Sequence, residues 1–273
     1  MNANVRAVPE ALRTWLAAHP RFVLAFSGGC DSAYLFYAAS ACGADFTACY
    51  VQSPFQPAFE LEDAMRLAKE LGREIDVLPL DVLADERVCA NPPDRCYHCK
   101  RRIFSAICAR AAAKGYGLVI DGTNASDDAG DRPGMRALRE LEVASPLRLC
   151  GLTKARVREL SREAELFTWN KPAYACLATR IPAGTPIDGE TLVKIERAEA
   201  ALAQLGFSDF RARLTQRGVR LELTEADMAR LMERRAEVCA ALEKDFGEIA
   251  LDLHPRRGLE AEITSQDTEY RGK

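Results

Sequence analysis

Apolar runs of strand length alternate with longer helical stretches over the first half of the chain. The predicted strands are Phe22–Phe26, Phe46–Val51, Glu74–Leu78 and Gly117–Asp121. The helices predicted between them are Ala33–Ala41, Ala58–Leu71 and Arg95–Ala113. Strands joined by helices of this length require crossover connections. The pattern therefore predicts an α/β fold with a parallel sheet that is covered by helices on both faces.

A different pattern follows a loop rich in Ala, Pro and Gly that ends near Pro186. Its order is helix, strand, strand, helix, strand, which favours a small α+β layer with an antiparallel sheet. We therefore expect two domains, residues 1–186 and residues 187–273. The elements predicted in the second domain are Asp188–Leu205, Phe210–Leu214, Val219–Leu223, Glu225–Lys244 and Ile249–Leu253.

The composition argues against nucleic acid binding and against a membrane protein. The 273 residues include 37 Lys and Arg against 40 Asp and Glu, a balance that gives no global electrostatic case for nucleic acid binding. No apolar run reaches the ~18 residues that a membrane helix needs. The N-terminal stretch also lacks the apolar core of a signal peptide. We expect a cytoplasmic protein without nucleic acid or membrane partners, whose ten cysteines stay reduced.

The turn after the first predicted strand carries the strongest chemical signal. Its sequence, from Ser27 to Ser32, is Ser-Gly-Gly-Cys-Asp-Ser. Gly28 and Gly29 have no Cβ, so backbone N–H groups can point into one concavity, and the following helix N-terminus favours a phosphate there. The Gly-Lys-Ser/Thr of a Walker loop is absent. The alternative is an ordinary glycine turn.

Ligands of parallel sheets bind beyond the carboxyl ends of the strands. Residues that follow the fourth predicted strand are therefore expected to share the pocket of the glycine turn. These residues are Gly122, Thr123 and Asn124.

Three cysteines allow several interpretations. Cys96 and Cys99 are one helical turn apart, and Cys176 lies in a loop. They could be packed thiols, ligands of a tetrahedral zinc (although a second closely spaced pair is missing), or ligands of a three-thiolate iron–sulfur cluster. Alternatively, Lys171 and Arg180 lower the pKa of the Cys176 thiol, and its thiolate attacks an activated acyl carbon.

The glycine turn resembles the loop with which ATP pyrophosphatases grip the β,γ-pyrophosphate of ATP. This resemblance implies an ATP-binding loop in which Asp31 and Ser32 act in catalysis. It also implies that Asp31 helps to hold Mg²⁺, which prefers carboxylate and phosphate oxygens. The ATP-binding residues would be Ser27, Gly28, Gly29, Asp31 and Ser32.

The glycine turn and several further blocks resemble the LarE sulfur transferases, which build the nickel-pincer nucleotide cofactor. The resemblance extends from Phe26 to about Leu253. The most specific block is Ala-Cys-Leu-Ala-Thr-Arg-Ile-Pro, from Ala175 to Pro182. The resemblance implies a PP-loop domain, similar to the adenine nucleotide alpha hydrolases, and a smaller C-terminal domain for substrate binding or oligomerisation. The other matching blocks are Asn91–Lys100, Asp121–Ala125, Asp131–Gly134, Ser145–Leu147, Gly151–Lys154 and Trp169–Ala175.

The resemblance implies that ATP adenylylates a carboxylate of a pyridinium dicarboxylate mononucleotide, and that sulfur then displaces AMP to give a thiocarboxylate. In some relatives the cysteine that matches Cys176 gives up its sulfur and becomes dehydroalanine. Relatives that have an additional pair of cysteines look like they hold a [4Fe-4S] cluster on three cysteines. The presence of Cys96 and Cys99 favours this cluster route for the chain. Arg211 and Arg213 match an Arg-x-Arg pair that binds the substrate phosphate. Arg180 belongs to the same binding site.

We also expect a homo-oligomer that transiently contacts other proteins of nickel-pincer cofactor biosynthesis. The chain departs from the family at Cys30, at Thr179 and in the tail His254–Arg257, which puts a C-terminal substrate contact in doubt. Competing hypotheses are another PP-loop enzyme, such as a tRNA thiolase or an amide-forming synthetase, and a non-catalytic nucleotide or redox sensor.

Overall fold

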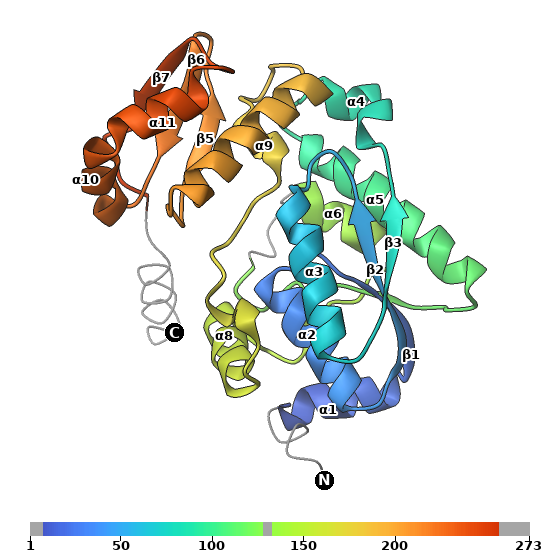
Figure 1. Cartoon of the computed structure of the whole chain (residues 1–273). Coiled ribbons are helices and arrows are strands. Elements are labelled where there is room, and N and C mark those ends of the chain that lie inside the picture. Colours follow the sequence, from blue (N-terminus) through green and yellow to red (C-terminus); the bar gives the residue numbers. More distant parts are fainter. Residues whose placement is uncertain (1–7, 128–132, 257–273) are drawn as a thin grey trace, which may run out of the picture. The chain divides into compact units, whose positions relative to one another are not determined.

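The computed structural model describes residues 8–127 and 133–256, which form two compact units (Figure 1). The first unit comprises the described residues of 1–82 and 94–171, and the second those of 83–93 and 172–256. Asp131 and Arg132 of the matching blocks, and the tail from residue 257, lie outside the described residues. The boundary at residue 186 between two functional domains stays a prediction.

The sheet of the first unit is parallel throughout, with the strand order β3-β2-β1-β4. This confirms the predicted α/β fold. The chain moves from β1 outward to β3 and then returns to the other side of β1. The sheet therefore has a topological switch point between β1 and β4, where such folds bind their ligands. The strands are β1 Arg21–Ala25, β2 Asp45–Gln52, β3 Ile75–Pro79 and β4 Val119–Ile120.

Helices cover both faces of this sheet because successive residues of a strand point to opposite sides. Phe22 and Leu24 pack with α1, α2, α3 and α8, whereas Val23 packs with α5 and α6. Burial on both faces explains why the strands are continuous apolar runs. The helices are α1 Glu10–Ala18, α2 Cys30–Ala41, α3 Ala58–Glu70, α5 Arg95–Ala113, α6 Pro133–Glu140, α7 Pro146–Leu149 and α8 Lys154–Glu163, with the 3-10 helix η3 Phe167–Asn170.

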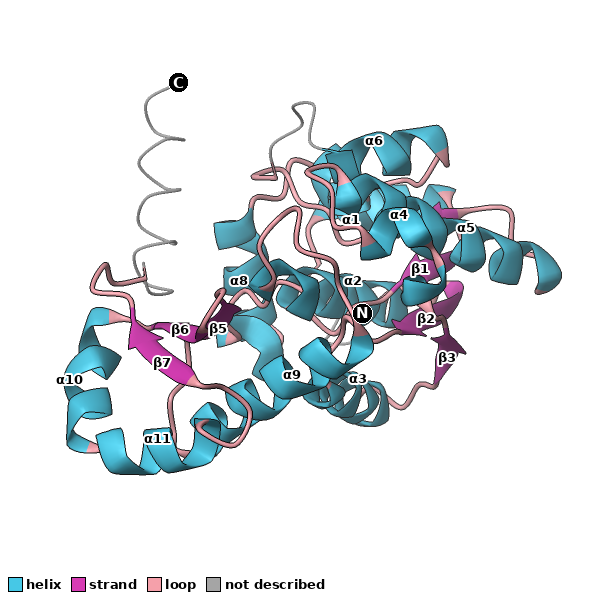
Figure 2. Ribbon diagram, turned by 90° about the horizontal axis from the view of Figure 1, so that it is seen from above, coloured by secondary structure: helices cyan, strands magenta, loops and turns pink. Residues whose placement is uncertain are grey.

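The second unit contains a three-stranded sheet in the order β5-β6-β7. The prediction of an antiparallel sheet is only half right: β5 pairs antiparallel with β6, but β7 pairs parallel with β6. The predicted helix from Glu225 to Lys244 is two helices, α10 and α11, and these carry the chain back to the starting end of the sheet (Figure 2). The elements are α4 Glu86–Cys89, η4 Leu177–Arg180, α9 Gly189–Gln204, β5 Arg211–Leu214, β6 Gly218–Glu222, α10 Glu225–Glu233, α11 Arg235–Leu242 and β7 Glu248–Leu251.

The two faces of this small sheet differ in chemistry. Ala212, Val219 and Leu221 share one face and are buried. The register pairs Arg211 with Glu222, and Arg213 with Arg220. Paired residues point to the same side of a sheet, so these four charged side chains gather on the opposite face.

Candidate functional site

The glycine turn of the first unit is held by its own hydroxyl groups. The Ser32 hydroxyl donates to the Gly29 carbonyl at 3.1 Å, and the Ser27 hydroxyl lies 3.0 Å from Ser32 Oγ, to which it donates. Gly28 has φ +74°, and a Cβ there would lie 3.1 Å from the carbonyl oxygen of Glu60. The first N–H groups of α2 have no acceptor within the helix, so they remain available for an anion.

Asp31 stands at the start of α2 with one oxygen paired and the other unpaired. Its Oδ2 accepts from Lys154 Nζ at 2.5 Å, whereas Oδ1 is buried and has no hydrogen-bond partner among the described residues. Burial raises the pKa of the Asp31 carboxyl, although Lys154 acts in the opposite direction. A buried carboxylate oxygen without a donor fits a hard cation such as Mg²⁺. Sequence reasoning assigned no role to Lys154, and its only signal was the block Gly151–Lys154.

A cavity of about 360 Å³ opens beside this turn, within the first unit. One part of its lining is polar and comes from the glycine turn, and another part is apolar and comes from α5. Pockets for small molecules start at about 300 Å³ and combine an apolar wall with a few polar groups, as a nucleotide with a base and phosphates requires. The lining includes Ser27, Gly29, Asp31, Ser32, Val51, Lys100, Ile103, Phe104 and Ile107. Lys100 was not among the residues singled out from the sequence.

The segment after β4 reaches the same cavity. Gly122 and Thr123 line it, as does Asp127, which sequence reasoning missed. Asn124 does not line the cavity, and its Oδ1 instead accepts from the Ser126 N–H at 2.8 Å. Asp121 also lines the cavity, and it accepts from the hydroxyls of Thr123 and Ser145 at 2.5 and 2.6 Å.

We predict that Gly122→Ala destabilises the protein. A Cβ at this position would lie 2.8 Å from the backbone nitrogen of Ser32 and 3.0 Å from its Cα, so α2 or the β4 loop must shift. Overpacking of this kind costs about 1–3 kcal/mol. Denaturant unfolding measures the loss. The matched control is Gly117→Ala, whose Cβ would meet nothing within 4 Å. Equal unfolding free energies of the two variants would contradict the prediction.

The predicted cluster ligands are divided between the two units. Cys96 and Cys99 lie one turn apart on α5 of the first unit, where Cys96 is exposed and Cys99 is buried. The Nη2 of Arg95 donates to Cys96 Sγ at 3.6 Å. Cys176 precedes η4 in the second unit. Within either stretch that the structure describes, no three His, Cys, Asp or Glu side chains form a metal-binding group, and the ligand set stays a prediction.

Cys30, inside the glycine turn, is buried against α8. Its Sγ lies 3.7 Å from Ser161 Oγ, and burial raises the pKa of its thiol. A thiol in this setting stays protonated and acts as a small packing group.

Arg180 organises the chain around Cys176. Its side chain has no exposed surface, and it forms two hydrogen bonds with Glu199, at 2.7 and 3.0 Å. Its Nη1 donates to the Ala175 carbonyl at 3.0 Å. The hydroxyl of Tyr174 also donates to Glu199. The loop on the N-terminal side of the cysteine is therefore tied to α9 by a buried ion pair.

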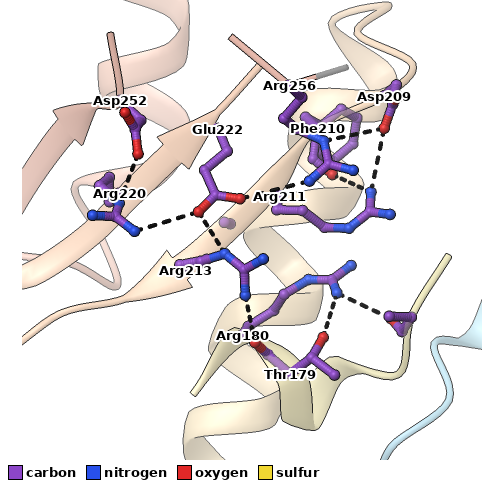
Figure 3. Close-up of polar contacts among 12 residues, drawn as sticks. Thr179, Arg180, Asp209, Phe210, Arg211, Arg213, Arg220, Glu222, Asp252 and Arg256 are labelled. Atoms are coloured by element: carbon purple, nitrogen blue, oxygen red, sulfur yellow. Dashed lines mark hydrogen bonds and ion pairs between the residues drawn. The ribbon is translucent and has the colours of Figure 1, made fainter. Parts of the chain in front are cut away.

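Arg211 and Arg213 lie on the charged face of the small sheet (Figure 3). Arg211 lies 3.6 Å from Asp209, and Arg213 Nε donates to Glu222 at 2.5 Å. Arg256 connects the two acids, at 3.3 Å from Asp209 and 3.6 Å from Glu222. Burial, together with the charges of Arg180 and Arg256, lowers the pKa of Arg211 to about 10.

Arg180 and Arg256 add positive charge beside the buried Arg211 guanidinium. An anion bound there would relieve the repulsion. The charged face can therefore bind an anion such as a phosphate, which matches the bidentate geometry of arginine.

No protein-family model matches the sequence. An uncharacterized protein of Synechocystis is 36% identical over 215 residues, covering 78% of this chain and 80% of the relative. The pyridinium-3,5-bisthiocarboxylic acid mononucleotide synthase of Lactiplantibacillus plantarum is 34% identical over 236 residues, covering 85% and 86%. An uncharacterized protein of Methanocaldococcus jannaschii is 28% identical over 227 residues, covering 83% and 86%.

Between residues 8 and 127, and between 133 and 256, no helix combines the length and the apolar character that crossing a bilayer requires.

Proposed function

The chain belongs to the LarE family, and we propose that it is an ATP-dependent sulfur transferase that converts a carboxylate of a pyridinium dicarboxylate mononucleotide into a thiocarboxylate. The observation that carries the proposal is the cavity of the first unit. There, the N-terminus of α2 and Asp31 Oδ1, which has no hydrogen-bond partner among the described residues, lie beside an apolar wall. This combination suits the phosphates and the base of ATP.

The first step activates the carboxylate. A carboxylate oxygen of the substrate attacks the α-phosphorus of ATP. The bond from that phosphorus to the bridging oxygen breaks, and pyrophosphate leaves with the electron pair. The turn from Ser27 to Ser32 holds the pyrophosphate through hydroxyl and backbone N–H donors. Asp31 would hold Mg²⁺, which neutralises charge on the phosphates when it is bound.

The second step replaces AMP by sulfur. A sulfur nucleophile attacks the acyl carbon, and the bond to AMP breaks. In one route Cys176 Sγ is the nucleophile and forms a thioester. Loss of the Cα proton then cleaves the Cβ–S bond, which releases the thiocarboxylate and leaves dehydroalanine at position 176.

In the other route the sulfur comes from outside the chain. Cys96, Cys99 and Cys176 would hold a [4Fe-4S] cluster, which supplies a sulfide when it is bound. Three thiols are the donor set that leaves one iron open. We favour this route because all three cysteines are present. Arg180 holds the loop that carries Cys176 in either route.

Arg211 and Arg213 are proposed to bind the phosphate of the mononucleotide. The support is the burial of Arg211 beside Arg180 and Arg256, which together lower the pKa of its guanidinium. Alternate residues of β5 face the same side, so both guanidinium groups can reach one anion. Tyr174 belongs to the loop that carries Cys176, and its ring lies 5.3 Å from the Arg211 guanidinium.

The products formed from ATP test the proposal. The purified protein, with MgATP and the pyridinium dicarboxylate mononucleotide, is expected to release AMP and pyrophosphate only when the substrate is present. Chromatography of the nucleotides measures this. Release of ADP and orthophosphate, or recovery of intact ATP, would refute the proposal, and the latter result is expected for a non-catalytic sensor. Activity with tRNA instead of the mononucleotide would favour a tRNA thiolase.

A further inference from the structure

Three arginines of the second unit converge on one carboxylate, that of Glu222 (Figure 3). Its Oε1 accepts from Arg213 Nε at 2.5 Å and from Arg220 Nη2 at 3.4 Å. Its Oε2 lies 3.6 Å from Arg256 Nη1. We propose that Glu222 is a positioning residue that holds these arginines in place for the phosphate of the substrate. The proposal rests on the function proposed above, and it assigns a role to a residue outside the sequence motifs.

The exposures of the side chains fit this role. The Glu222 side chain is only 13% exposed, whereas Arg213 and Arg220 are 35% and 45% exposed. The carboxylate therefore lies beneath guanidinium groups that reach the surface. A buried acid that contacts several arginines orients them all at once, because each loses its freedom to rotate away.

The contacts of Arg213 show which part of it stays available. Its Nε donates to Glu222, and its Nη1 donates to the Thr179 carbonyl at 2.7 Å. Its Nη2 has no acceptor among the residues of the second unit that the structure describes. The guanidinium is thus held at two of its three nitrogens, and its remaining N–H groups can bind a ligand oxygen without further loss of side-chain entropy.

Two other acids complete the arrangement. Arg220 also lies 3.5 Å from Asp252, and Arg256 lies 3.3 Å from Asp209. Each of these acids contacts a guanidinium that Glu222 contacts as well. Glu222 is distinguished because it joins Arg213, Arg220 and Arg256 into one group.

A purely electrostatic role for Glu222 predicts the opposite effect on binding. Its negative charge repels a phosphate, so neutralising it should tighten the binding of an anion if charge alone matters. If Glu222 positions the arginines, its removal weakens binding, because three guanidinium groups lose their common acceptor. The sign of the change in affinity therefore distinguishes the two roles.

The experiment compares Glu222→Gln and Glu222→Ala with the wild-type protein. Glutamine keeps the shape and one acceptor oxygen, whereas alanine removes both oxygens. The probes are nicotinate mononucleotide, which carries a pyridinium carboxylate and a phosphate, and the corresponding nucleoside without the phosphate. We expect the Kd for the mononucleotide to rise about tenfold in Glu222→Ala and less in Glu222→Gln, as loss of charge-assisted hydrogen bonds implies. The Kd for the nucleoside should not change.

Turnover supplies a second readout. The KM for the dicarboxylate mononucleotide should rise in the same order, while kcat and the KM for ATP stay as in the wild type. The matched control is Glu248→Gln on β7 of the same sheet, where the acid is 49% exposed and lies 3.9 Å from Arg217. Circular dichroism melting identifies any variant that does not fold.

Tighter binding of the mononucleotide by Glu222→Gln would overturn the proposal, as would equal losses for the mononucleotide and the nucleoside. If Glu222→Ala does not fold, Glu222→Gln alone tests the proposal. The test is then whether its affinity for the mononucleotide falls, and whether the change requires the phosphate. The two proposals can also fail separately. If the Glu222 variants weaken phosphate-dependent binding but the protein never forms pyrophosphate, the role of Glu222 is supported and the proposed reaction is refuted.

Discussion

Replacing Asp31 by asparagine is expected to reduce pyrophosphate formation by at least about 100-fold, the size of effect that loss of one preorganised charged group produces. Asparagine has the same shape but cannot neutralise Mg²⁺, and the unpaired Oδ1 of the wild type is the atom proposed to bind it. The loss should appear in the rate of AMP formation at saturating MgATP. Raising the Mg²⁺ concentration should recover part of the activity, because the site is weakened rather than removed.

The control for this variant is Asp63→Asn. Asp63 pairs with Lys171 at 2.6 Å, much as Asp31 pairs with Lys154, but it does not line the cavity. If loss of an aspartate–lysine pair mattered only for folding, both variants would lose activity together. We expect Asp63→Asn to keep its rate of AMP formation. Activity of Asp31→Asn within about threefold of the wild type, which is less than 1 kcal/mol, would exclude Asp31 from the phosphate site.

The pH dependence of AMP formation gives an independent check on Asp31. Burial raises the pKa of its carboxyl, so the group takes up a proton at a higher pH than an ordinary aspartate does. Mg²⁺ requires the deprotonated form. As the pH falls, the wild-type rate should therefore decline earlier than titration of an exposed carboxyl would cause. The residual rate of Asp31→Asn should lack this decline.

Replacing Cys176 by alanine is expected to abolish thiocarboxylate formation while AMP and pyrophosphate are still produced. Both proposed sulfur routes need this thiol, as a nucleophile in one and as a cluster ligand in the other, but adenylylation does not. The acyl adenylate should then react with water, which regenerates the carboxylate. Mass spectrometry of the nucleotide products measures the thiocarboxylate, and chromatography measures AMP.

The matched control is Cys239→Ala, a half-buried cysteine on α11 of the same unit. It should form thiocarboxylate at the wild-type rate. Thiocarboxylate produced by Cys176→Ala would refute both routes. The intact mass of the wild-type protein after one turnover distinguishes the two routes. Only the route in which Cys176 gives up its sulfur lowers this mass, by the mass of H₂S. Cys96→Ala should form less thiocarboxylate than the wild type only if the cluster route operates.

Local patterns were sufficient to predict most of the first unit. The four strands and their parallel direction follow from apolar runs separated by helices, and the structure confirms them. The helix from Arg95 to Ala113 has the predicted ends. The glycine turn lies beside a cavity, as its two glycines and the following helix indicate. These features depend on residues close together in the chain, so the sequence expresses them directly.

The second unit was harder to predict. The order of its elements does not decide whether β7 runs parallel or antiparallel to β6, because this depends on how α10 and α11 pack. Packing between distant residues also decides the place of Glu199. The structure buries it against Arg180, and its Oε1 accepts from the N–H of Ala212 at 2.9 Å.

The sequence by itself therefore determined the parallel sheet, the glycine turn from Ser27 to Ser32 and the positions of the cysteines along the chain. Only the tertiary structure decided which charges meet. Asp31 and Lys154 are 123 positions apart, and Glu222 reaches Arg256 from another element. The physical reason is that periodicity and turn chemistry act over a few residues. An ion pair between distant segments exists only after packing of the core has brought them together.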